Sequence, residues 1–494
     1  MKKIFLFQQR EWSVRIGQFL TKKLISDGYS LGCLTFKPST HQLIKSVYNK
    51  DYKLCLSHDE IYDNPEKFII DPKITLEEIS RDLNYPSLWK LVQSDRNIVR
   101  NYREKFNYSF GKSVDDSAII NYLKAIYFTC VYVHRNFKPD IIFSPNFVSI
   151  PHIFFNLFFK RKKTIMFATF DTKVGNNMIF VSDYLGRSGK FHDNMKLKKF
   201  NKINYRKVRL FLNNFNQKSK QYLIYNRSNQ KIDLYNEIKS IAKLLRSIFR
   251  SFFYGNPNKN KLYTTLDDQN VFYLIRDYFC KLISKNQILN FRYSDLNKID
   301  KFIFFPLQYQ PEASLDVWSP LNNNQIETAR KIAMCLPPDY TLVVKDHPDM
   351  FGFRNKSYIN KISKLPNVKI IKPTISSAEV LDKSKLLIII SGSIAFEAAI
   401  KKKICIQLGD SGITNLLPNV YVEKNFEKLP YTIRKLMNLK IKKNYDKNLY
   451  YYIDQAFKCG FNSNYLSSWV ENKVIDINDF YKKLKLEINF YLDK

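Results

Sequence analysis

Residues 386–408 read LLIIISGSIAFEAAIKKKICIQL, and their types change in the order strand, turn, helix, strand. The apolar run Leu386–Ile390 is typical of a buried strand, and the small residues after it indicate a turn. Ile394–Lys401 then has a helical composition, and Ile404–Leu408 is apolar again. A helix between two buried strands predicts a parallel sheet that carries helices on its faces.

The same alternation surrounds this stretch and extends over residues 301–425. The segments that continue it are Phe302–Pro306, Asn322–Leu336, Tyr340–Lys345, Asn367–Ile371 and Ser376–Ser384. Short apolar strands with helices between them predict one Rossmann-like lobe.

The first third of the chain repeats this pattern. Strands are expected at Ile4–Phe7, Ser30–Phe36, Ile141–Ser144 and Thr164–Ala168, and helices at Glu11–Ser26 and from Asp115 onwards. The residues before about Gly111 look polar and irregular, with short helices. We therefore expect an α/β protein with Rossmann-like lobes at residues 1–195 and 301–425, a basic helical insertion and linker at 196–300, and C-terminal helices at 426–494.

Bulk composition favours a folded, soluble protein. Hydrophobic residues make up 45% and charged residues 25% of the 494 positions, which excludes a mainly disordered chain. No segment reaches the roughly 18 apolar residues that a membrane-spanning helix needs. The N-terminal MKKIFLFQQREW has too short an apolar region for a signal peptide, so we expect a first strand and a cytosolic protein. The seven cysteines and six histidines show no metal-ligand spacing, and no metal is expected.

The formal net charge of +35 favours an anionic partner, such as nucleic acid, anionic lipid or an anionic substrate. Abundant Lys, Asn and Ile are also typical of AT-rich coding sequences, which would make part of the charge a matter of codon usage. Residues 238–253 repeat apolar side chains at helical spacing, with Lys and Arg between them. Such a helix can lie on an anionic membrane, but packing on its own domain is favoured, because any surface helix needs an apolar stripe.

Three segments follow strands, and ligands of open parallel sheets bind beyond the carboxyl ends of the strands. The first segment is Ser391-Gly392-Ser393. A strand, a small-residue turn and a helix start together present free backbone N–H groups, which suit a phosphate. Glu397, one turn into the helix, can accept hydrogen bonds from ribose hydroxyls. A serine at a helix start is also a common helix cap.

The second segment is Lys345-Asp346-His347-Pro348, directly after a strand. Pro348 restricts His347 to an extended conformation, which holds the imidazole at the sheet edge. There it can donate to a phosphate oxygen, and Lys345 adds charge. The third segment, residues 308–312 (Gln-Tyr-Gln-Pro-Glu), offers one carboxylate and two amides, with an ordinary polar loop as the alternative.

Together these segments resemble the capsule polysaccharide biosynthesis family, which includes bacterial Kdo transferases that start capsule chains on a lipid anchor. The matching sequence segments are FPLQYQPEAS, VVKDHP, LPNVKII and SGSIAFEAAIKKKICIQLG, and they occur in the same order as in the family. A weaker match, FDTKVGNNMIFVSD, lies at Phe170–Asp183. The good resemblance covers only the part of the chain from about Lys301 to Asp410.

The resemblance implies a GT-B architecture, in which the C-terminal lobe holds a nucleotide sugar and the N-terminal lobe holds the acceptor. It implies a CMP-activated acidic sugar such as Kdo as donor and no further cofactor. His347 and the Ser391–Ser393 turn would hold its phosphate, and Glu397 its ribose. Asp346 stands where the family more often has Glu, and Ser-Gly-Ser where it more often has Thr-Gly-Thr, and both changes keep the chemistry.

Glycosyl transfer needs a base for the acceptor hydroxyl, or a carboxylate nucleophile, and stabilisation of the departing phosphate. Glu312 is the candidate base or nucleophile, and Asp171 and Asp183 are the alternatives from the N-terminal lobe. His347 is the candidate for stabilising the phosphate. GT-B enzymes generally need no metal for this, and no DxD motif stands in a plausible metal-binding position.

The acceptor is expected to be lipid-linked or a glycan. Its candidate contacts are Gln310, Lys173 and Asp183, and Lys173 stands where the family usually has arginine, which leaves acceptor recognition open. A lipid-linked acceptor would place the protein peripherally on the inner face of the plasma membrane.

Three other functions stay open. A nucleotide-sugar 2-epimerase would share the two-lobed fold and the phosphate turn, but would form product without an acceptor. A basic nucleic-acid-binding protein would account for the charge, although no recognised binding motif appears. A degenerate transferase lobe could act as an assembly scaffold.

Overall fold

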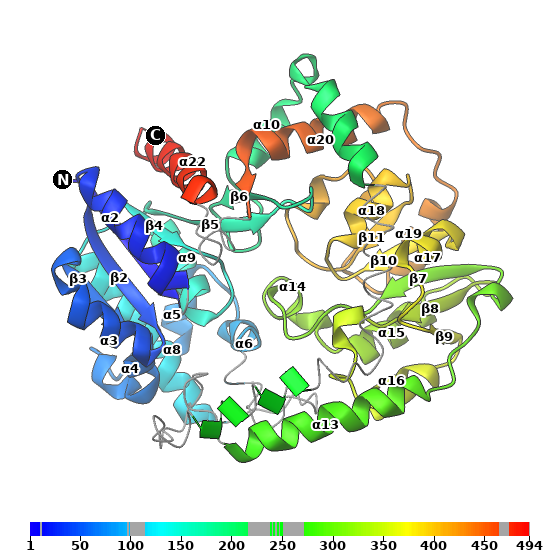
Figure 1. Cartoon of the computed structure of the whole chain (residues 1–494), viewed down its shortest axis with the longest axis horizontal. Coiled ribbons are helices and arrows are strands. Elements are labelled where there is room, and N and C mark those ends of the chain that lie inside the picture. The colour runs from blue at the N-terminus through cyan, green and yellow to red at the C-terminus, as the bar shows by residue number, and fades with distance from the viewer. Residues whose placement is uncertain are drawn as a thin grey trace.

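The computed structural model describes residues 1–9, 12–95, 98, 114–215, 238–239, 241–242, 245–246, 248–249, 271–463 and 474–493. These residues form two α/β lobes, which lie on the left and on the right of Figure 1. The arrangement is GT-B-like, as expected from the alternating pattern and the resemblance.

The N-terminal lobe contains a seven-stranded sheet in the order β13-β6-β5-β4-β1-β2-β3. Its strands are β1 (Lys3–Gln9), β2 (Ser30–Phe36), β3 (Leu54–Ser57), β4 (Ile141–Ser144), β5 (Ile165–Asp171), β6 (Asn177–Val181) and β13 (Phe461–Asn462). The five strands from β5 to β3 are parallel, whereas β6 and β13 are antiparallel to their neighbours. The four expected strands are confirmed. The stretch before Gly111 was predicted to be irregular, and this prediction missed β3. The strand has only four residues, too few for an alternating apolar and polar pattern to be recognised.

Helices cover both faces of this sheet. They are α2 (Gln18–Ser26), α3 (Pro38–Val47), α4 (His58–Asp63), α5 (Leu76–Leu83), α6 (Leu88–Val92), α8 (Asp116–Asn136), α9 (Ile150–Arg161) and α10 (Lys190–Leu197). The long helix expected after Asp115 is confirmed as α8, and Ile119, Leu123 and Ile126 form its buried stripe. The helix expected from Glu11 is a short π-helix, Ser13–Gly17, that continues into α2.

The C-terminal lobe contains a six-stranded, entirely parallel sheet in the order β12-β11-β10-β7-β8-β9. Its strands are β7 (Phe302–Pro306), β8 (Thr341–Lys345), β9 (Val368–Ile371), β10 (Leu386–Ile389), β11 (Cys405–Gln407) and β12 (Val420–Val422). Its helices are α14 (Ala313–Asp316), α15 (Gln325–Met334), α16 (Lys356–Ser363), α17 (Ser377–Lys383), α18 (Ile394–Ile400) and α19 (Leu429–Met437). The elements predicted in this lobe are confirmed to within a few residues at their ends, whereas α14, α16 and β12 were not expected.

The last two helices among the described residues return to the N-terminal lobe (Figure 1). They are α20 (Tyr445–Cys459) and α22 (Val474–Leu492). Phe480, Leu484 and Ile488 of α22 lie in one buried cluster with Ile4 and Leu6 of β1. The C-terminal helices were predicted as helices, but their place on the first sheet depends on contacts across almost the whole chain.

The two lobes are in direct contact. The rings of Phe170 and Trp318 stack with their centroids 4.6 Å apart. The N–H of Gly412 donates to Leu185 O at 2.8 Å, and His192 Nε2 lies 3.2 Å from Gly412 O. A Cβ atom at position 412 would lie 2.3 Å from the backbone oxygen of Gly186, so only glycine permits this approach.

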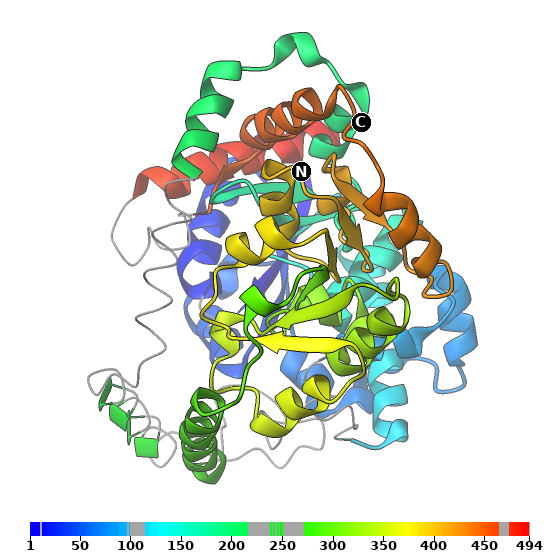
Figure 2. The same cartoon turned by 90° about the vertical axis from the view of Figure 1, so that its right-hand side faces the viewer.

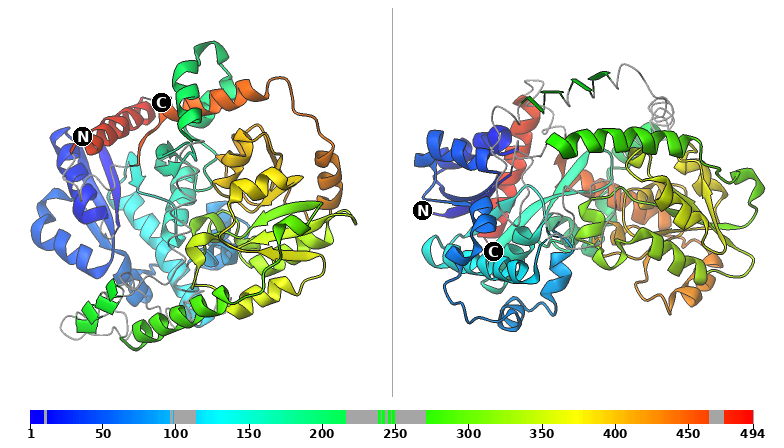
Figure 3. Two further views of the ribbon diagram at one scale, coloured as in Figure 1. Left: turned by 45° about the vertical axis from the view of Figure 1, so that its right-hand side comes forward. Right: turned by 90° about the horizontal axis from the view of Figure 1, so that it is seen from below.

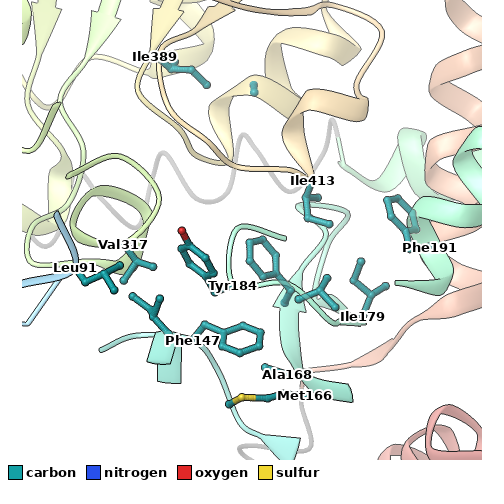
Figure 4. Packing of buried hydrophobic residues seen from close by; sticks show 14 of the residues in the cluster. Leu91, Phe147, Met166, Ala168, Ile179, Tyr184, Phe191, Val317, Ile389 and Ile413 are labelled. Carbon is teal, nitrogen blue, oxygen red and sulfur yellow. The ribbon is translucent and has the colours of Figure 1, made fainter. Parts of the chain in front are cut away.

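Apolar side chains from both lobes complete this interface. Phe147 and Tyr184 of the N-terminal lobe and Val317 and Ile413 of the C-terminal lobe belong to one buried cluster (Figure 4). The interface therefore combines a buried apolar cluster with hydrogen bonds between the lobes.

Within the predicted insertion and linker, residues 216–237 and 250–270 lie outside the described residues. Eight positions of the helix predicted at 238–253 are described and are helical. The helix α13 (Val271–Leu289) belongs to the same segment and runs along the outside of the C-terminal lobe (Figure 2, Figure 3). No helix among the described residues has the length and apolarity needed to cross a membrane.

Apolar side chains of the insertion and of α13 face outwards. Those that are exposed among the described residues are Ile238, Ile241, Leu245, Phe249, Ile275, Phe279, Ile283 and Leu289. The preferred interpretation, that the stripe of residues 238–253 packs on its own domain, is wrong at its described positions.

Candidate functional site

The candidate site lies at the carboxyl edge of the C-terminal sheet. Strand β7 stands between β10 and β8, and all three are parallel, so their C-terminal loops meet at one edge. These loops carry Gln308 after β7, Lys345 at the end of β8 and Ser391 after β10. The topology thus brings together the three segments that the sequence singled out.

The Ser391–Ser393 turn presents backbone donors without protein acceptors. Ser391 is buried, and its Oγ donates to Ser314 O at 3.0 Å. Gly392 has φ 125°, a conformation that side chains disfavour. In the described part of the chain, the N–H groups of Gly392 and Ser393 donate to no protein acceptor. Two such neighbouring donors suit an anionic oxygen.

Lys345 is a buried cation beside this turn. Its side chain is 3% exposed, and Nζ donates to Ser377 Oγ at 3.1 Å. It forms no salt bridge with another described residue. Burial lowers the pKa of Lys345 to about 8, against the opposing effects of Asp346 and Glu397. The ammonium therefore stays mostly protonated at pH 7 and lacks a paired anion.

The side chains of Glu397 and Lys345 interact electrostatically. Burial raises the pKa of Glu397, and Lys345 and Lys401 oppose the shift. Its carboxylate comes from α18, one turn after the Ser391–Ser393 turn. Its assignment to a ribose stays a prediction.

His347 has the extended backbone that Pro348 was expected to impose, with φ −69° and ψ 132°. The N–H of Asp349 donates to His347 Nδ1 at 3.2 Å. Burial lowers the pKa of His347, while Asp349 and Asp346 oppose the shift. The imidazole is thus neutral at pH 7, and because Nδ1 accepts, the ring proton sits on Nε2. A neutral N–H donor at this edge fits the predicted contact to a phosphate.

Asp346 and Arg354 form a buried ion pair that the sequence did not reveal. Their side chains are 5% and 3% exposed. Asp346 Oδ1 accepts from Arg354 and also from the N–H of His347, at 2.8 Å for the latter. Arg354 further donates to Gln308 O at 2.5 Å. This guanidinium therefore ties the loop after β7 to the loop after β8.

The loop after β7 is held by side-chain amides. Gln325 accepts from the N–H of Gln308 at 2.7 Å and donates to Gln308 O at 3.2 Å. The amide of Gln310 accepts from Gln325 at 3.0 Å and donates to Asn323 O at 2.9 Å. Gln310 was predicted to contact the acceptor. In this structure its side-chain amide is hydrogen-bonded to Gln325 and Asn323 and thereby holds the loop.

Glu312 opens α14, between the two lobes in Figure 1. Its side chain is exposed, and Oε2 accepts from Ser314 Oγ at 2.6 Å. The carboxylate is thus oriented by a neighbour and open to solvent, as a base or nucleophile requires.

The N-terminal candidates stand at the lobe interface. Asp171 ends β5 and accepts from Lys173 Nζ at 2.9 Å and from Lys173 N at 2.7 Å. Asp183 accepts from the N–H of Leu185 at 2.9 Å. In the described part of the chain, no hydrogen bond or ion pair joins either carboxylate to Glu312.

Comparison with known proteins adds a family match. Residues 267–413 match the family described as capsule polysaccharide biosynthesis protein. No curated protein matches the chain.

Solved structures match over most of their length. A beta Kdo 2,7 transferase of Thermosulfurimonas dismutans is 11% identical over 92% of this chain and 90% of its own, with a TM-score of 0.30. The UDP-GlcNAc 2-epimerase of Neisseria meningitidis is 13% identical over 93% and 98%, with a TM-score of 0.26. The calicheamicin glycosyltransferase CalG4 is 12% identical over 96% and 98%, with a TM-score of 0.28.

Proposed function

Since residues 267–413 carry the match to the capsule polysaccharide biosynthesis family, we propose that this chain is a glycosyltransferase of bacterial capsule or surface polysaccharide biosynthesis. It transfers a sugar from a nucleotide donor to a lipid-linked or glycan acceptor. The observation that carries the proposal is the pair of backbone N–H groups at Gly392 and Ser393, which have no acceptor among the described residues, at the same sheet edge as the buried ammonium of Lys345.

The donor phosphate binds at this group of donors. Lys345 supplies the positive charge, the two backbone amides supply directed hydrogen bonds, and His347 supplies a neutral N–H. Glu397 accepts from the ribose hydroxyls. The donor is a CMP-linked acidic sugar such as Kdo, in keeping with the family of the matched segment.

In the reaction, the bond between the anomeric carbon and the phosphate oxygen breaks, and the phosphate gains charge as it leaves. Lys345, His347 and the amides of Gly392 and Ser393 stabilise that charge where it develops. Glu312 takes the proton of the acceptor hydroxyl, or attacks the anomeric carbon as a nucleophile in a two-step transfer. No bound metal ion is part of this scheme.

The acceptor is presented at the inner face of the plasma membrane. The exposed apolar side chains of α13 and of the described positions at 238–249 support this, together with the net charge of +35. Apolar side chains next to basic ones bind anionic lipid surfaces through both burial and charge.

A thermal-shift panel tests the nucleotide site. Purified protein is mixed with CMP, UDP and GDP and their sugar conjugates, because a ligand of the folded state raises the melting temperature by mass action. We expect a rise with CMP that is lost in His347→Ala and kept in His134→Ala, a histidine of α8. A rise with UDP alone indicates a UDP-linked donor in place of a CMP-linked one. Product formation from a UDP-sugar without acceptor identifies an epimerase. If only nucleic acid stabilises the protein, it is not a transferase.

Glu312→Gln tests the catalytic carboxylate. Loss of a positioned base or nucleophile is expected to slow transfer by about 10²–10⁴-fold while CMP binding stays as in the wild type. Transfer is measured with lipid-linked acceptor in vesicles, and Glu327→Gln, an exposed acid of α15, is the matched control. Near-normal transfer by Glu312→Gln would move the role to Asp171 or Asp183.

A further inference from the structure

The side-chain amide of Gln308 has no established partner, although the residue around it is firmly held. Three hydrogen bonds hold its backbone: its N–H donates to Gln325, and its carbonyl accepts from Gln325 and from Arg354. The N–H of Leu307 also donates to Lys345 O at 2.8 Å, which joins this loop to β8. The position of Gln308 is therefore defined independently of its side chain.

The amide itself is buried and incompletely bonded. Gln308 is 9% exposed, and its Nε2 has no hydrogen-bond partner among the residues that the structure describes. Ser391 Oγ lies 3.5 Å from Gln308 Oε1 but 3.0 Å from Ser314 O. A hydroxyl has one hydrogen, which the shorter contact takes, so the amide keeps at most a weak interaction with Ser391. A buried amide without partners is rare in folded proteins and calls for an explanation.

Gly392 lies directly opposite this amide. A Cβ atom at position 392 would lie 3.4 Å from Gln308 Nε2, and φ of Gly392 is 125°. The glycine thus leaves space between the amide and the turn. The free N–H groups of Gly392 and Ser393 belong to the same turn, and β7 stands between the strands that carry Ser391 and Lys345. All these groups are donors, and an oxygen-rich anion supplies the acceptor that they lack.

We infer that the side chain of Gln308 is a ligand-binding residue, which donates from Nε2 to a phosphate oxygen held on the Gly392 turn. An amide can turn either end towards the ligand, and an anion selects the NH₂ end. Arg354 and Gln325 act as positioning residues, because they hold the backbone of Gln308 at the distance from which its side chain reaches the turn. The inference rests on the proposed function only in that the phosphate belongs to a nucleotide donor.

Gln308→Met separates this role from a structural one, because methionine matches the size of glutamine without its amide. Binding of CMP and of inorganic phosphate is measured by calorimetry, and the melting temperature without ligand is measured in parallel. We expect about tenfold weaker binding of both probes, the loss of one hydrogen bond to a charged group, with a melting temperature at or above that of the wild type. Unchanged affinity in Gln308→Met overturns the inference, whatever happens to the melting temperature.

Gln308→Asn is the second variant, in case the methionine protein does not fold. It keeps an amide but shortens the side chain by one methylene, which withdraws the donor from the turn. Weaker binding supports the inference, and wild-type binding overturns it. The control is Gln407→Glu, since the amide of Gln407 is fully used by Gly409 O, Asn415 and Thr414. It is expected to lower the melting temperature.

The two probes keep the inference and the proposed function apart. Wild-type protein that binds phosphate but no nucleotide contradicts the proposed function, and the Gln308 variants still decide the inference with phosphate. Wild-type protein that binds CMP, together with variants that bind it equally well, contradicts the inference and leaves the proposed function standing. Wild-type protein that binds neither probe overturns both.

Discussion

Replacement of Lys345 by methionine is expected to abolish nucleotide binding and to stabilise the protein. The ammonium is 3% exposed and has no salt-bridge partner among the described residues. Loss of a buried cation that faces a phosphate weakens binding by at least about 30-fold. Affinity is measured by calorimetry with CMP, and stability by denaturant unfolding.

The gain in stability follows from the pKa. Burial lowers the pKa of Lys345 from 10.5 to about 8. The unfolded chain therefore binds the proton more tightly than the folded one, which costs the folded state about 3 kcal/mol at neutral pH. Methionine removes this cost but also the hydrogen bond to Ser377, worth about 1 kcal/mol, so the net gain is about 2 kcal/mol.

The pH dependence has a definite sign. The cost of Lys345 is fully present below pH 8 and fades as pH rises from 8 to 10.5, where the unfolded lysine also loses its proton. The stability difference between the methionine variant and the wild type is therefore expected to shrink over that range. CMP affinity of the wild type is expected to fall above pH 8, because binding then requires uptake of a proton.

Lys403→Met is the matched control. Lys403 lies between α18 and β11, near the amino end of that strand, and donates to Asp382 O and Ser384 O. Its replacement is expected to leave CMP binding unchanged. A Lys345→Met protein that is less stable than the wild type and still binds CMP would show that this lysine is a structural residue.

Arg354→Met is expected to destabilise the protein by about 3–5 kcal/mol, because it leaves Asp346 buried without its cation. The two side chains are 3% and 5% exposed, so water does not compensate the carboxylate. The guanidinium also donates to Gln308 O, and that bond is lost as well. Denaturant unfolding measures the loss.

A double-mutant cycle with Asp346→Asn separates the charge from the geometry. Removing both charges is expected to restore much of the stability, since no unpaired buried ion remains. CMP affinity is expected to stay low in the double variant, because nothing then ties the loop of Gln308 to that of His347. Full recovery of both stability and affinity would contradict the positioning role of Arg354. Arg330→Met, at an exposed pair with Glu327, is the control and is expected to change little.

Much of this fold could be predicted from local patterns of apolar and turn-forming residues in the sequence. The strands β1, β2, β7, β8 and β10 are apolar runs bounded by turn residues, and such runs are buried in any parallel sheet. The elements that were missed are short. β3, β6, β12 and β13 have between two and five residues, and pairing with neighbours, not their own composition, makes them strands.

The residues of the candidate site also fall into two groups, those that the sequence reveals and those that only the structure reveals. Lys345, His347 and the Ser391–Ser393 turn could be selected because each directly follows a strand, and parallel topology places all such residues at one edge. Arg354 could not be selected, and Gln308 was only one of two amides in its loop, since their contacts with Asp346 and Ser391 are encoded by no spacing.

The residues alone were thus sufficient for the two α/β lobes and for the sheet edge at which the candidate site lies, because hydrophobic periodicity and turn chemistry act over a few neighbours. Tertiary structure alone decided that α22 completes the first lobe, that Gly412 lets the lobes touch and that Lys345 is buried without a salt bridge to another described residue. Burial, charge pairing and close backbone approach are properties of segments far apart in the chain, and they exist only once the chain has folded.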